Sequence, residues 1–316
     1  MNRYPGGFTL VELMISLALG SVLCLGVTTL LAFAQRAYLQ DEELARLQEN
    51  GRHALKFLER ELAMAGFLGR LQPDGISKAA PIGTDCYAYI LQPERGLEHF
   101  DDIGVEGLSP IGSHVPDECR RPGQYQPGSD VFILRRTLDA PHRDFGETAV
   151  PLFDQTLYLA ASGHTGSLLP GAAVSAMATS VWQYHPQQLF VRRYSVSDGD
   201  GVPSLCRQRL SPNRAALAPL ECLVEGVEML QLEFGLDTDG DRLPDRYSAI
   251  PTAGDLERVV LVRIFLLLRA AREVAGYRDN RSYRLGETVF QAPGDGYYRL
   301  LFSSAVLVRN SDVFRS

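Results

Sequence analysis

The chain has 316 residues, and 45% of them are hydrophobic, which is enough to bury a sizeable core in one large domain or two small ones. Its formal net charge is -7 at pH 7, and the sequence has no lysine or arginine run and no alternation of basic and aromatic residues. The sequence therefore lacks the clustered positive charge that is typical of nucleic-acid-binding proteins.

The N-terminal segment from Phe8 to Ala34 is almost wholly apolar, and Glu12 is its one charged side chain. The segment is long enough to span a bilayer as a helix. A charge at membrane depth costs about 2 to 3.5 kcal/mol. Because of this cost, a charged residue such as Glu12 in this segment indicates a functional role.

A cleaved secretory signal peptide is the competing interpretation of this segment. Arg3 supplies a positive flank, and Ala32-Phe33-Ala34 offers a small-x-small cleavage site before Gln35. Against it, the apolar core of a signal peptide has only about 7 to 15 residues and does not carry a carboxylate near its start.

A helical pattern continues beyond the apolar segment. Between residues 35 and 66, apolar residues recur at helical spacing and charged residues occupy the opposite face. The pattern predicts one helix from about Thr9 to Ala65, with Gly66 as its C-cap. Asn50-Gly51 weakens the helix locally and predicts a kink.

From Phe67 onward, short apolar runs alternate with turns rich in proline and glycine, which indicates strands. We expect an α+β fold in which the long helix covers an antiparallel sheet, within one domain over residues 67–316. The predicted strands are Asp130 to Arg136, Gln155 to Ala160, Gln188 to Tyr194, Val227 to Gly235, Arg258 to Leu268 and Tyr297 to Val308.

Four cysteines lie outside the apolar segment, and none has zinc-site spacing. Two disulfides in an oxidising compartment are therefore favoured over a metal site. The cost of loop closure mildly favours the near pairs, Cys86 with Cys119 and Cys206 with Cys222, although three connectivities stay open.

The string DTDGDRLPDRY predicts a calcium loop. It places four aspartates at positions one, three, five and nine of an EF-hand-like loop, namely Asp237, Asp239, Asp241 and Asp245. Position six is Arg242 where glycine is usual, and position twelve is Ser248 where a bidentate glutamate is usual. Binding of Ca²⁺ would therefore be weak. The alternative interpretation is an acidic turn exposed to solvent. No other cofactor is expected.

Catalytic motifs are missing from the sequence. It contains no GxSxG, HExxH or P-loop string, and its six histidines are scattered without metal-ligand spacing. We therefore expect a protein that is not an enzyme.

The stretch GGFTLVEL, from Gly6 to Leu13, resembles the N-terminus of type IV pilins. The resemblance implies that a prepilin peptidase cuts after Gly7 and methylates Phe8, so that residues 1–7 are a leader and residues 8–34 remain as a transmembrane and fibre-core helix. It also implies that Glu12 neutralises the Phe8 amine of a neighbouring subunit and so favours assembly.

Three further stretches are similar to PilW-type minor pilins: LQENGRHALKFLERELAMAGF, LVEGVEMLQLEFGLDTDGD and the last predicted strand, which ends in SSAVLVRN. Arg70 stands where members often have a cysteine, which puts the family's disulfide pattern in doubt. The resemblance implies a minor pilin that primes type IV pilus assembly near the tip. Its implied partners are other minor pilins, the major pilin, prepilin peptidase, the inner-membrane assembly machinery and a non-pilin tip adhesin.

The expected location is the inner membrane, with a single span and a periplasmic domain, and then the pilus at the cell surface. Two alternatives stay open. One is a type II secretion pseudopilin, and the other is a secreted soluble binding protein or enzyme with a cleaved signal peptide.

Overall fold

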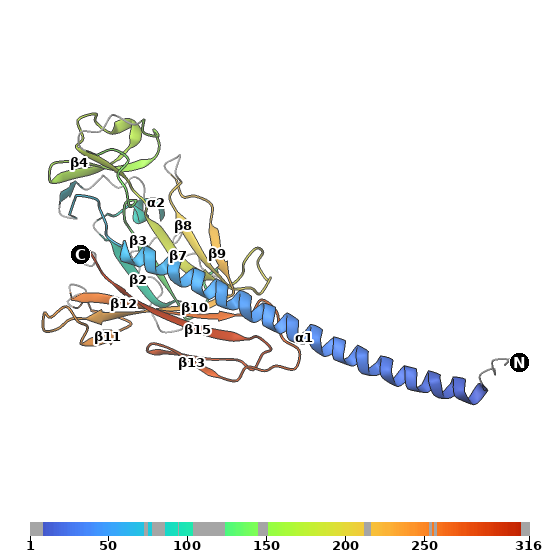
Figure 1. Cartoon of the computed structure of the whole chain (residues 1–316). Helices are drawn as coiled ribbons and strands as arrows, with labels where there is room; N and C mark the ends of the chain where they lie inside the picture. Colours follow the sequence, from blue (N-terminus) through green and yellow to red (C-terminus); the bar gives the residue numbers. More distant parts are fainter. Residues whose placement is uncertain are drawn as a thin grey trace, which may run out of the picture. The chain divides into compact units, whose positions relative to one another are not determined.

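The structure is a computed structural model that describes residues 9–72, 75–77, 86–93, 95–103, 124–144, 151–211, 216–252, 255 and 258–310. The chain divides into two compact units, Met1–Arg46 and Leu47–Ser316. Helix α1 (Leu10–Ala63) is uninterrupted and contributes to both units (Figure 1). The expected helix from Thr9 to Ala65 thus matches α1 to within two residues at each end.

The end of α1 follows from Gly66. This glycine has a φ of 69°, the left-handed conformation that glycine adopts at helix C-termini, and its N–H donates to the Arg135 carbonyl at 3.0 Å. Gly51, by contrast, lies within the continuous helix. A Cβ atom there would lie 2.3 Å from the Phe302 ring, so Gly51 permits a close approach of that ring to the helix.

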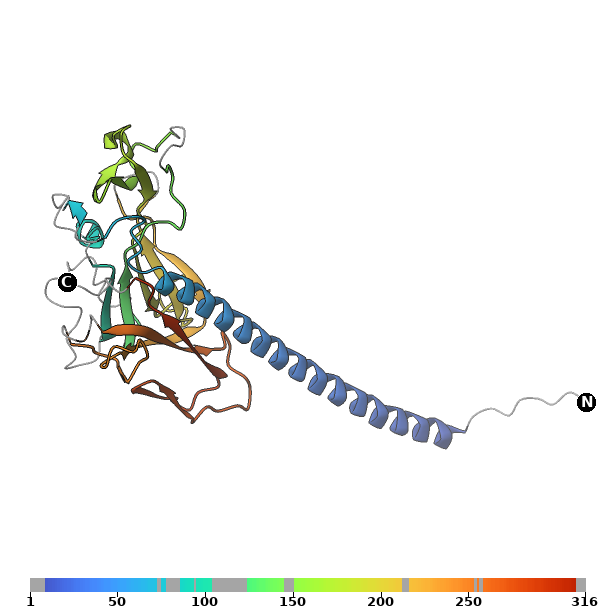
Figure 2. The ribbon, with the colours of Figure 1, turned by 60° about the vertical axis from the view of Figure 1, so that its left-hand side comes forward.

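The described residues of the second unit form four sheets, where the sequence led us to expect one. A five-stranded antiparallel sheet has the order β2-β3-β7-β8-β9, and a four-stranded antiparallel sheet has the order β11-β10-β12-β15. A third sheet, β1-β5-β4-β6, contains the parallel pair β1–β5, and β13–β14 is a hairpin. Figure 2 shows the third sheet and the hairpin at opposite ends of this unit.

The elements of the second unit have the following bounds: β1 (Ile76–Ser77), α2 (Cys86–Ile90), β2 (Leu97–Ile103), β3 (Ser129–Leu134), β4 (Leu157–Ser162), β5 (Thr165–Pro170), the 3-10 helix η2 (Gly171–Ala173), β6 (Ser180–Gln183), β7 (Gln187–Arg192), β8 (Ser204–Arg209), β9 (Glu221–Glu225), β10 (Val227–Leu236), β11 (Arg246–Ser248), β12 (Val259–Arg269), β13 (Ser282–Leu285), β14 (Thr288–Gln291) and β15 (Arg299–Leu307). All six predicted strands are present, displaced by at most two residues. The strands that were not predicted are mostly short or polar.

The main core joins the C-terminal part of α1 to the two larger sheets. Leu47, Ala54, Leu58 and Leu62 are buried against apolar side chains of β3, β7, β8, β10 and β12. Their spacing of four or seven residues places them on one face of the helix. The predicted α+β architecture, with a long helix against antiparallel sheets, is therefore confirmed.

Candidate assembly site

The start of α1 is closed by a reciprocal cap between Thr9 and Glu12. Glu12 Oε2 accepts hydrogen bonds from the Thr9 N–H and the Thr9 hydroxyl, both at 2.9 Å. The Thr9 hydroxyl oxygen accepts the Glu12 N–H at 3.3 Å. This is a capping box, and the string Thr9-Leu10-Val11-Glu12 carries its signature, which the sequence interpretation overlooked. Glu12 therefore has a local structural role in the single chain.

The remaining part of the predicted N-terminal site lies outside the described residues. Gly7, the predicted cleavage position, and Phe8, the predicted site of methylation, are both there. The expected ion pair between the Phe8 amine of one subunit and Glu12 of a neighbouring subunit stays a prediction.

The first unit exposes its apolar side chains around the whole helix. Between Leu10 and Phe33, the exposed fraction of the large apolar residues runs from 55% to 75%. Soluble monomers rarely expose so much contiguous apolar surface. Within the described residues, α1 alone is long and apolar enough to cross a membrane, by length and composition.

The hydroxyl groups in this apolar segment bond to the helix's own backbone. Ser16 donates to the Glu12 carbonyl at 2.7 Å, and Ser21 donates to the Ala18 carbonyl at 2.8 Å. Thr28 and Thr29 donate to carbonyls three or four residues earlier. These groups need no partner from lipid or from another helix. Glu12 is thus the one charged group that the segment presents.

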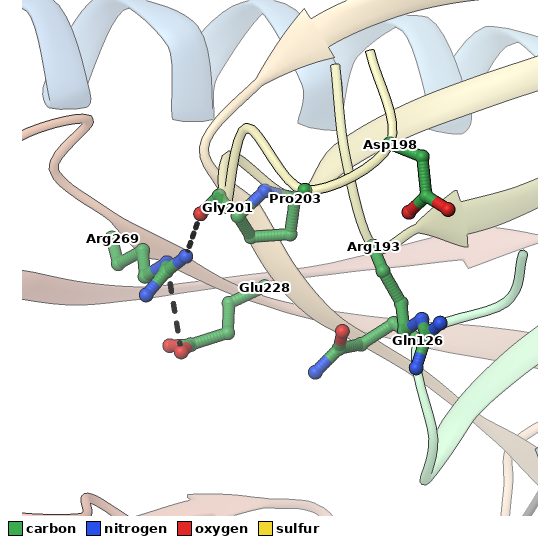
Figure 3. Close-up of a pocket in the computed structure, with 8 residues that line it drawn as sticks. Gln126, Arg193, Asp198, Gly201, Pro203, Glu228 and Arg269 are labelled. Atoms are coloured by element: carbon green, nitrogen blue, oxygen red, sulfur yellow. Dashed lines mark hydrogen bonds and ion pairs between the residues drawn. The ribbon is translucent and has the colours of Figure 1, made fainter. Parts of the chain in front are cut away.

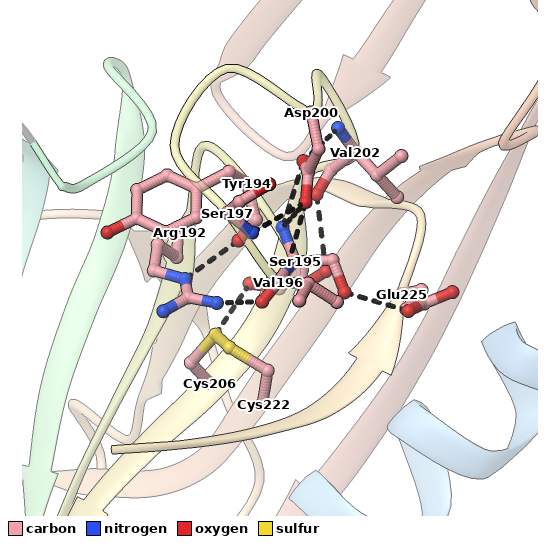
Figure 4. Close-up of a disulfide and its surroundings, with 11 residues drawn as sticks. Arg192, Tyr194, Ser195, Val196, Ser197, Asp200, Val202, Cys206, Cys222 and Glu225 are labelled. Atoms are coloured by element: carbon pink, nitrogen blue, oxygen red, sulfur yellow. Dashed lines mark hydrogen bonds between the residues drawn. A yellow bond between two sulfur atoms is a disulfide. The ribbon is translucent and has the colours of Figure 1, made fainter. Parts of the chain in front are cut away.

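In the second unit, Cys206 on β8 and Cys222 on β9 form a disulfide across paired strands (Figure 4). This pairing confirms one of the two predicted bridges. Cys86 is also disulfide-bonded, but Cys119 lies outside the described residues, so the pairing of these two stays a prediction. Bridges of this kind persist in oxidising compartments.

Beside the disulfide, the acidic turn at residues 195–202 is held by Asp200. Its carboxylate accepts the backbone N–H groups of Ser195, Val196, Ser197 and Val202 (Figure 4). Desolvation opposes the charge, but these hydrogen bonds outweigh it and lower the pKa of Asp200 to about 2. The carboxylate is therefore a structural anchor of the turn.

The predicted calcium loop brings three of its four aspartates together. Asp237, Asp239 and Asp241 each offer a carboxylate oxygen within 4.8 Å of the others. Asp245 instead accepts the N–H and hydroxyl of Thr238, at 2.7 and 2.6 Å, and closes the base of the loop.

The backbone of this loop also has an EF-hand feature. Arg242, at position six, has a φ of 68°, the left-handed conformation that glycine supplies in an EF-hand. Asp237 accepts backbone N–H groups from Gly240 at 2.6 Å and Arg242 at 2.8 Å, and these bonds lower its pKa. Calcium binding itself stays a prediction.

A cleft of about 370 Å³ opens between the acidic turn and the ends of β10 and β12 (Figure 3). The described residues that line it are Gln126, Arg193, Asp198, Gly199, Gly201, Pro203, Glu228 and Arg269. Arg269 donates to the Gly201 carbonyl and lies 3.8 Å from a Glu228 oxygen. These described residues include no histidine or cysteine, and much of their charge is already paired.

Buried ion pairs stabilise the second unit, and sequence reasoning missed all of them. Arg299 forms a two-bond contact with Glu228, at 2.6 and 3.1 Å, and another with Asp295, at 2.6 and 2.7 Å. Arg136 binds Glu61 of α1 at 2.9 and 3.0 Å. Arginine-rich composition gave no signal for which of the 29 arginines are buried, because Arg299–Glu228 and Arg136–Glu61 join distant parts of the chain.

Two family models match the chain. Residues 193–310 match the model described as Type IV Pilus-assembly protein W, and residues 2–28 match that of the prokaryotic N-terminal methylation motif. Among solved structures, a type IV-like pilin from Thermus thermophilus is similar, with a TM-score of 0.38 and 13% identity over 84% of this chain and 97% of that chain. No curated protein matches.

The N-terminal methylation motif, the long apolar helix and the antiparallel sheets define a type IV pilin-like protein. Within this class, residues 193–310 are similar to the PilW type. Its matched region begins at Arg193 and includes the disulfide, the Asp237 loop and β15.

Proposed function

We propose that this chain is a minor pilin that helps to initiate type IV pilus assembly and remains near the pilus tip. It acts by assembling with other subunits and not by catalysis. The PilW-type region and the methylation motif support this proposal. The size of the second unit, Leu47–Ser316, supports a position outside the repeating shaft, because such bulk is hard to pack at every subunit of a helical fibre.

The proposed location follows from the same features. The N-terminal helix sits in the inner membrane, the second unit lies in the periplasm, and both pass to the pilus on assembly. The disulfide between Cys206 and Cys222 suits the oxidising periplasm. The proposed partners are other minor pilins, the major pilin, prepilin peptidase, the inner-membrane assembly machinery and a tip adhesin.

The observation that carries the proposal is the outward apolar surface of α1, with the Glu12 carboxylate at its start. In a bundle of such helices the apolar side chains are covered by neighbours. Phe8 is the N-terminal residue after cleavage, and its positive amine can meet the Glu12 carboxylate of the next subunit. A charge that is costly alone is then stabilised only when subunits meet, which favours assembly in one register.

Substitutions at Glu12 separate the role in capping from the role of the charge. Glu12→Gln keeps a side-chain oxygen that can accept the Thr9 N–H, because glutamine also serves in a capping box. It removes the negative charge. We expect both Glu12→Gln and Glu12→Ala to leave the amount of protein in the inner membrane unchanged and to reduce surface pili.

The matched control is Ser16→Ala, one turn further along the same helix, which removes a hydroxyl that bonds only to the Glu12 carbonyl. It should leave both measurements at wild-type level. Pili would be counted in sheared surface fractions, and the protein would be quantified in membrane fractions. Wild-type piliation with Glu12→Gln would refute the role of the charge.

Mass spectrometry of the mature protein tests the processing step. The proposal requires an N-terminal methylated Phe8. A chain that begins at Gln35 would instead indicate a secreted protein with a cleaved signal peptide. A deletion strain distinguishes the pilus from a type II secretion system: loss of twitching motility supports the proposal, whereas loss of exoprotein release with normal motility contradicts it.

A further inference from the structure

A compact group of potential metal ligands lies between β2 and β3 in the second unit. His99 and Asp101 belong to β2, and Asp130 belongs to β3. One ligand atom of each lies within 4.8 Å of the others. The His99 side chain is 10% exposed and that of Asp130 is fully buried. No sequence motif predicted this group, because residues 99 and 130 are distant in the chain.

A β-bulge shapes this group. Phe100 pairs with Val131 and Ile103 pairs with Ser129, so that two residues of β2, Asp101 and Asp102, face one residue of β3. Asp102 has a φ of 44°, which is unusual for a residue with a side chain. Bulges redirect side chains and are enriched next to functional sites. Here the bulge brings Asp101 close to Asp130.

The orientation of the Asp130 carboxylate is fixed by its hydrogen bonds. Its Oδ2 atom accepts the Leu232 N–H of β10 at 2.7 Å and lies 2.8 Å from His99 Nε2. Its Oδ1 atom accepts the Asp102 N–H at 3.2 Å. The His99 ring packs edge-on against Phe234, with 5.1 Å between ring centroids. Ligands held in this way lose little freedom on binding an ion.

No arginine or lysine among the described residues pairs with this group. Asp101 Oδ1 is buried and accepts no hydrogen bond from the part of the chain that the structure describes. Among the described residues, the main charges that act on Asp101 are the carboxylates of Asp130, Asp102 and Glu287, opposed by His99 alone. Buried carboxylates are normally paired with a cation or bound to a metal.

The opposite face of β2 gives a direct contrast. Glu98, three positions before Asp101, contacts Arg135 at 3.1 Å and Arg95 at 3.2 Å. It also accepts the hydroxyl of Tyr89. The protein thus supplies arginines to the carboxylate on one face of the strand, whereas on the other face no arginine or lysine among the described residues pairs with Asp101.

We propose that His99, Asp101 and Asp130 bind one divalent cation of the zinc class. The donor set of one imidazole nitrogen and carboxylate oxygens suits Zn²⁺ better than Ca²⁺ or Mg²⁺, which prefer oxygen ligands alone. Three protein ligands leave a fourth position for water. With metal–ligand distances of about 2.0 Å, the His99–Asp130 contact has to open to about 3.3 Å, the edge of a tetrahedron.

The bound ion is a structural link. It joins the bulge of β2 to β3, and through Asp130 and the Leu232 N–H it reaches β10 in the other large sheet. It replaces the repulsion among the carboxylates with attraction to a common cation. This role is independent of the proposed part in pilus assembly.

The test uses untagged full-length protein in mild detergent, stripped with chelator and then titrated with Zn²⁺. We expect one Zn²⁺ ion per chain, measured by mass spectrometry of metal content, and a rise in melting temperature on the order of 5 °C at a hundredfold excess over Kd. Mg²⁺ at the same concentration should give a smaller rise. A wild-type protein that binds no Zn²⁺ would overturn the proposal.

Two variants locate the ion. Asp101→Asn retains the size of the side chain and removes its charge, and it should weaken Zn²⁺ binding at least about tenfold without lowering the melting temperature of the metal-free protein. His99→Gln retains a donor toward Asp130 and should weaken binding similarly. Asp237→Asn, in the other acidic group, should leave Zn²⁺ binding unchanged. Wild-type affinity in both Asp101→Asn and His99→Gln would overturn the proposal.

Discussion

The two units of the chain place polar and apolar groups in opposite ways. In the first unit, apolar side chains cover the outside of the helix, and hydroxyls bond to the helix's own backbone. In the second unit, apolar side chains form cores, and ion pairs such as Arg299–Glu228 are buried among them. The first unit keeps its structure through contacts within one or two turns. The second depends on contacts between distant residues.

The effect of a substitution should therefore depend on the unit in which it lies. A residue on the apolar surface of the first unit has few contacts within the chain, so its loss should change assembly and leave the folding free energy of the second unit unchanged. A buried residue of the second unit should change folding first. Substitutions in each unit can therefore test this division.

Replacing Arg299 should have the largest effect on folding. Its side chain is fully buried and contacts Glu228, Asp279 and Asp295, so Arg299→Leu leaves three carboxylates without their common cation. Breaking a buried ion pair costs about 3 to 5 kcal/mol. Denaturant unfolding of the full-length protein in detergent measures this loss. The same change at exposed Arg272 is the control and should cost little; equal losses at both positions would contradict the account.

Two leucines of the same helix give the most direct comparison. Leu58 is fully buried in the main core, whereas Leu23 is 70% exposed in the first unit. Leu58→Ala should lower the free energy of unfolding by about 2 to 5 kcal/mol, through the cavity it leaves. Leu23→Ala should leave it unchanged and reduce surface pili. If Leu23→Ala destabilised the second unit as much as Leu58→Ala, the division between the units would be wrong.

The elements governed by local pattern could be predicted from the sequence. Apolar residues at helical spacing located α1, and Gly66 marked its end because a left-handed residue is needed there. The strands β10, β12 and β15 were located by their apolar runs. The pair Cys206–Cys222 was mildly favoured by the lower cost of closing a short loop, while three connectivities stayed open, and the structure contains this pair.

Features that depend on tertiary contacts could not be predicted. The distribution of strands among four sheets depends on pairings such as β3 with β7, which no local pattern specifies. Arg136 and Glu61 are 75 residues apart, and the sequence around each of them looks like that around an exposed charged residue. The kink expected at Gly51 rested on helix propensity alone. In the structure, Gly51 leaves room for the Phe302 ring, which packs against the helix at this position. This contact forms only when the chain folds, so the local sequence does not indicate it.

Acid should weaken the second unit through the carboxylates around Arg299. Asp279 is buried, and although desolvation opposes its charge, hydrogen bonds from Arg281 and Tyr283 lower its pKa to about 2, from 3.8. Because the folded-state pKa is the lower one, the stabilisation is complete above about pH 4 and is lost as the pH falls toward 2. Asp279→Asn should therefore reduce the fall in melting temperature between pH 4 and pH 2. Parallel curves for the wild type and the variant would contradict this assignment.

Calcium should have the smallest effect, because the Asp237 loop is exposed at the surface of the second unit. Only Asp237, Asp239 and Asp241 converge, while Asp245 is engaged by Thr238, so any affinity should be in the weak range of about 10⁻⁴ to 10⁻³ M. At ten times Kd, Ca²⁺ should raise the melting temperature by on the order of 3 °C, and chelator should reverse the rise. Asp239→Asn should abolish the response. Asp198→Asn, an exposed aspartate of the other acidic turn, should retain it. A melting temperature indifferent to Ca²⁺ would leave the loop as a turn held by its own hydrogen bonds, since Asp237 and Asp245 already accept backbone N–H groups without an ion.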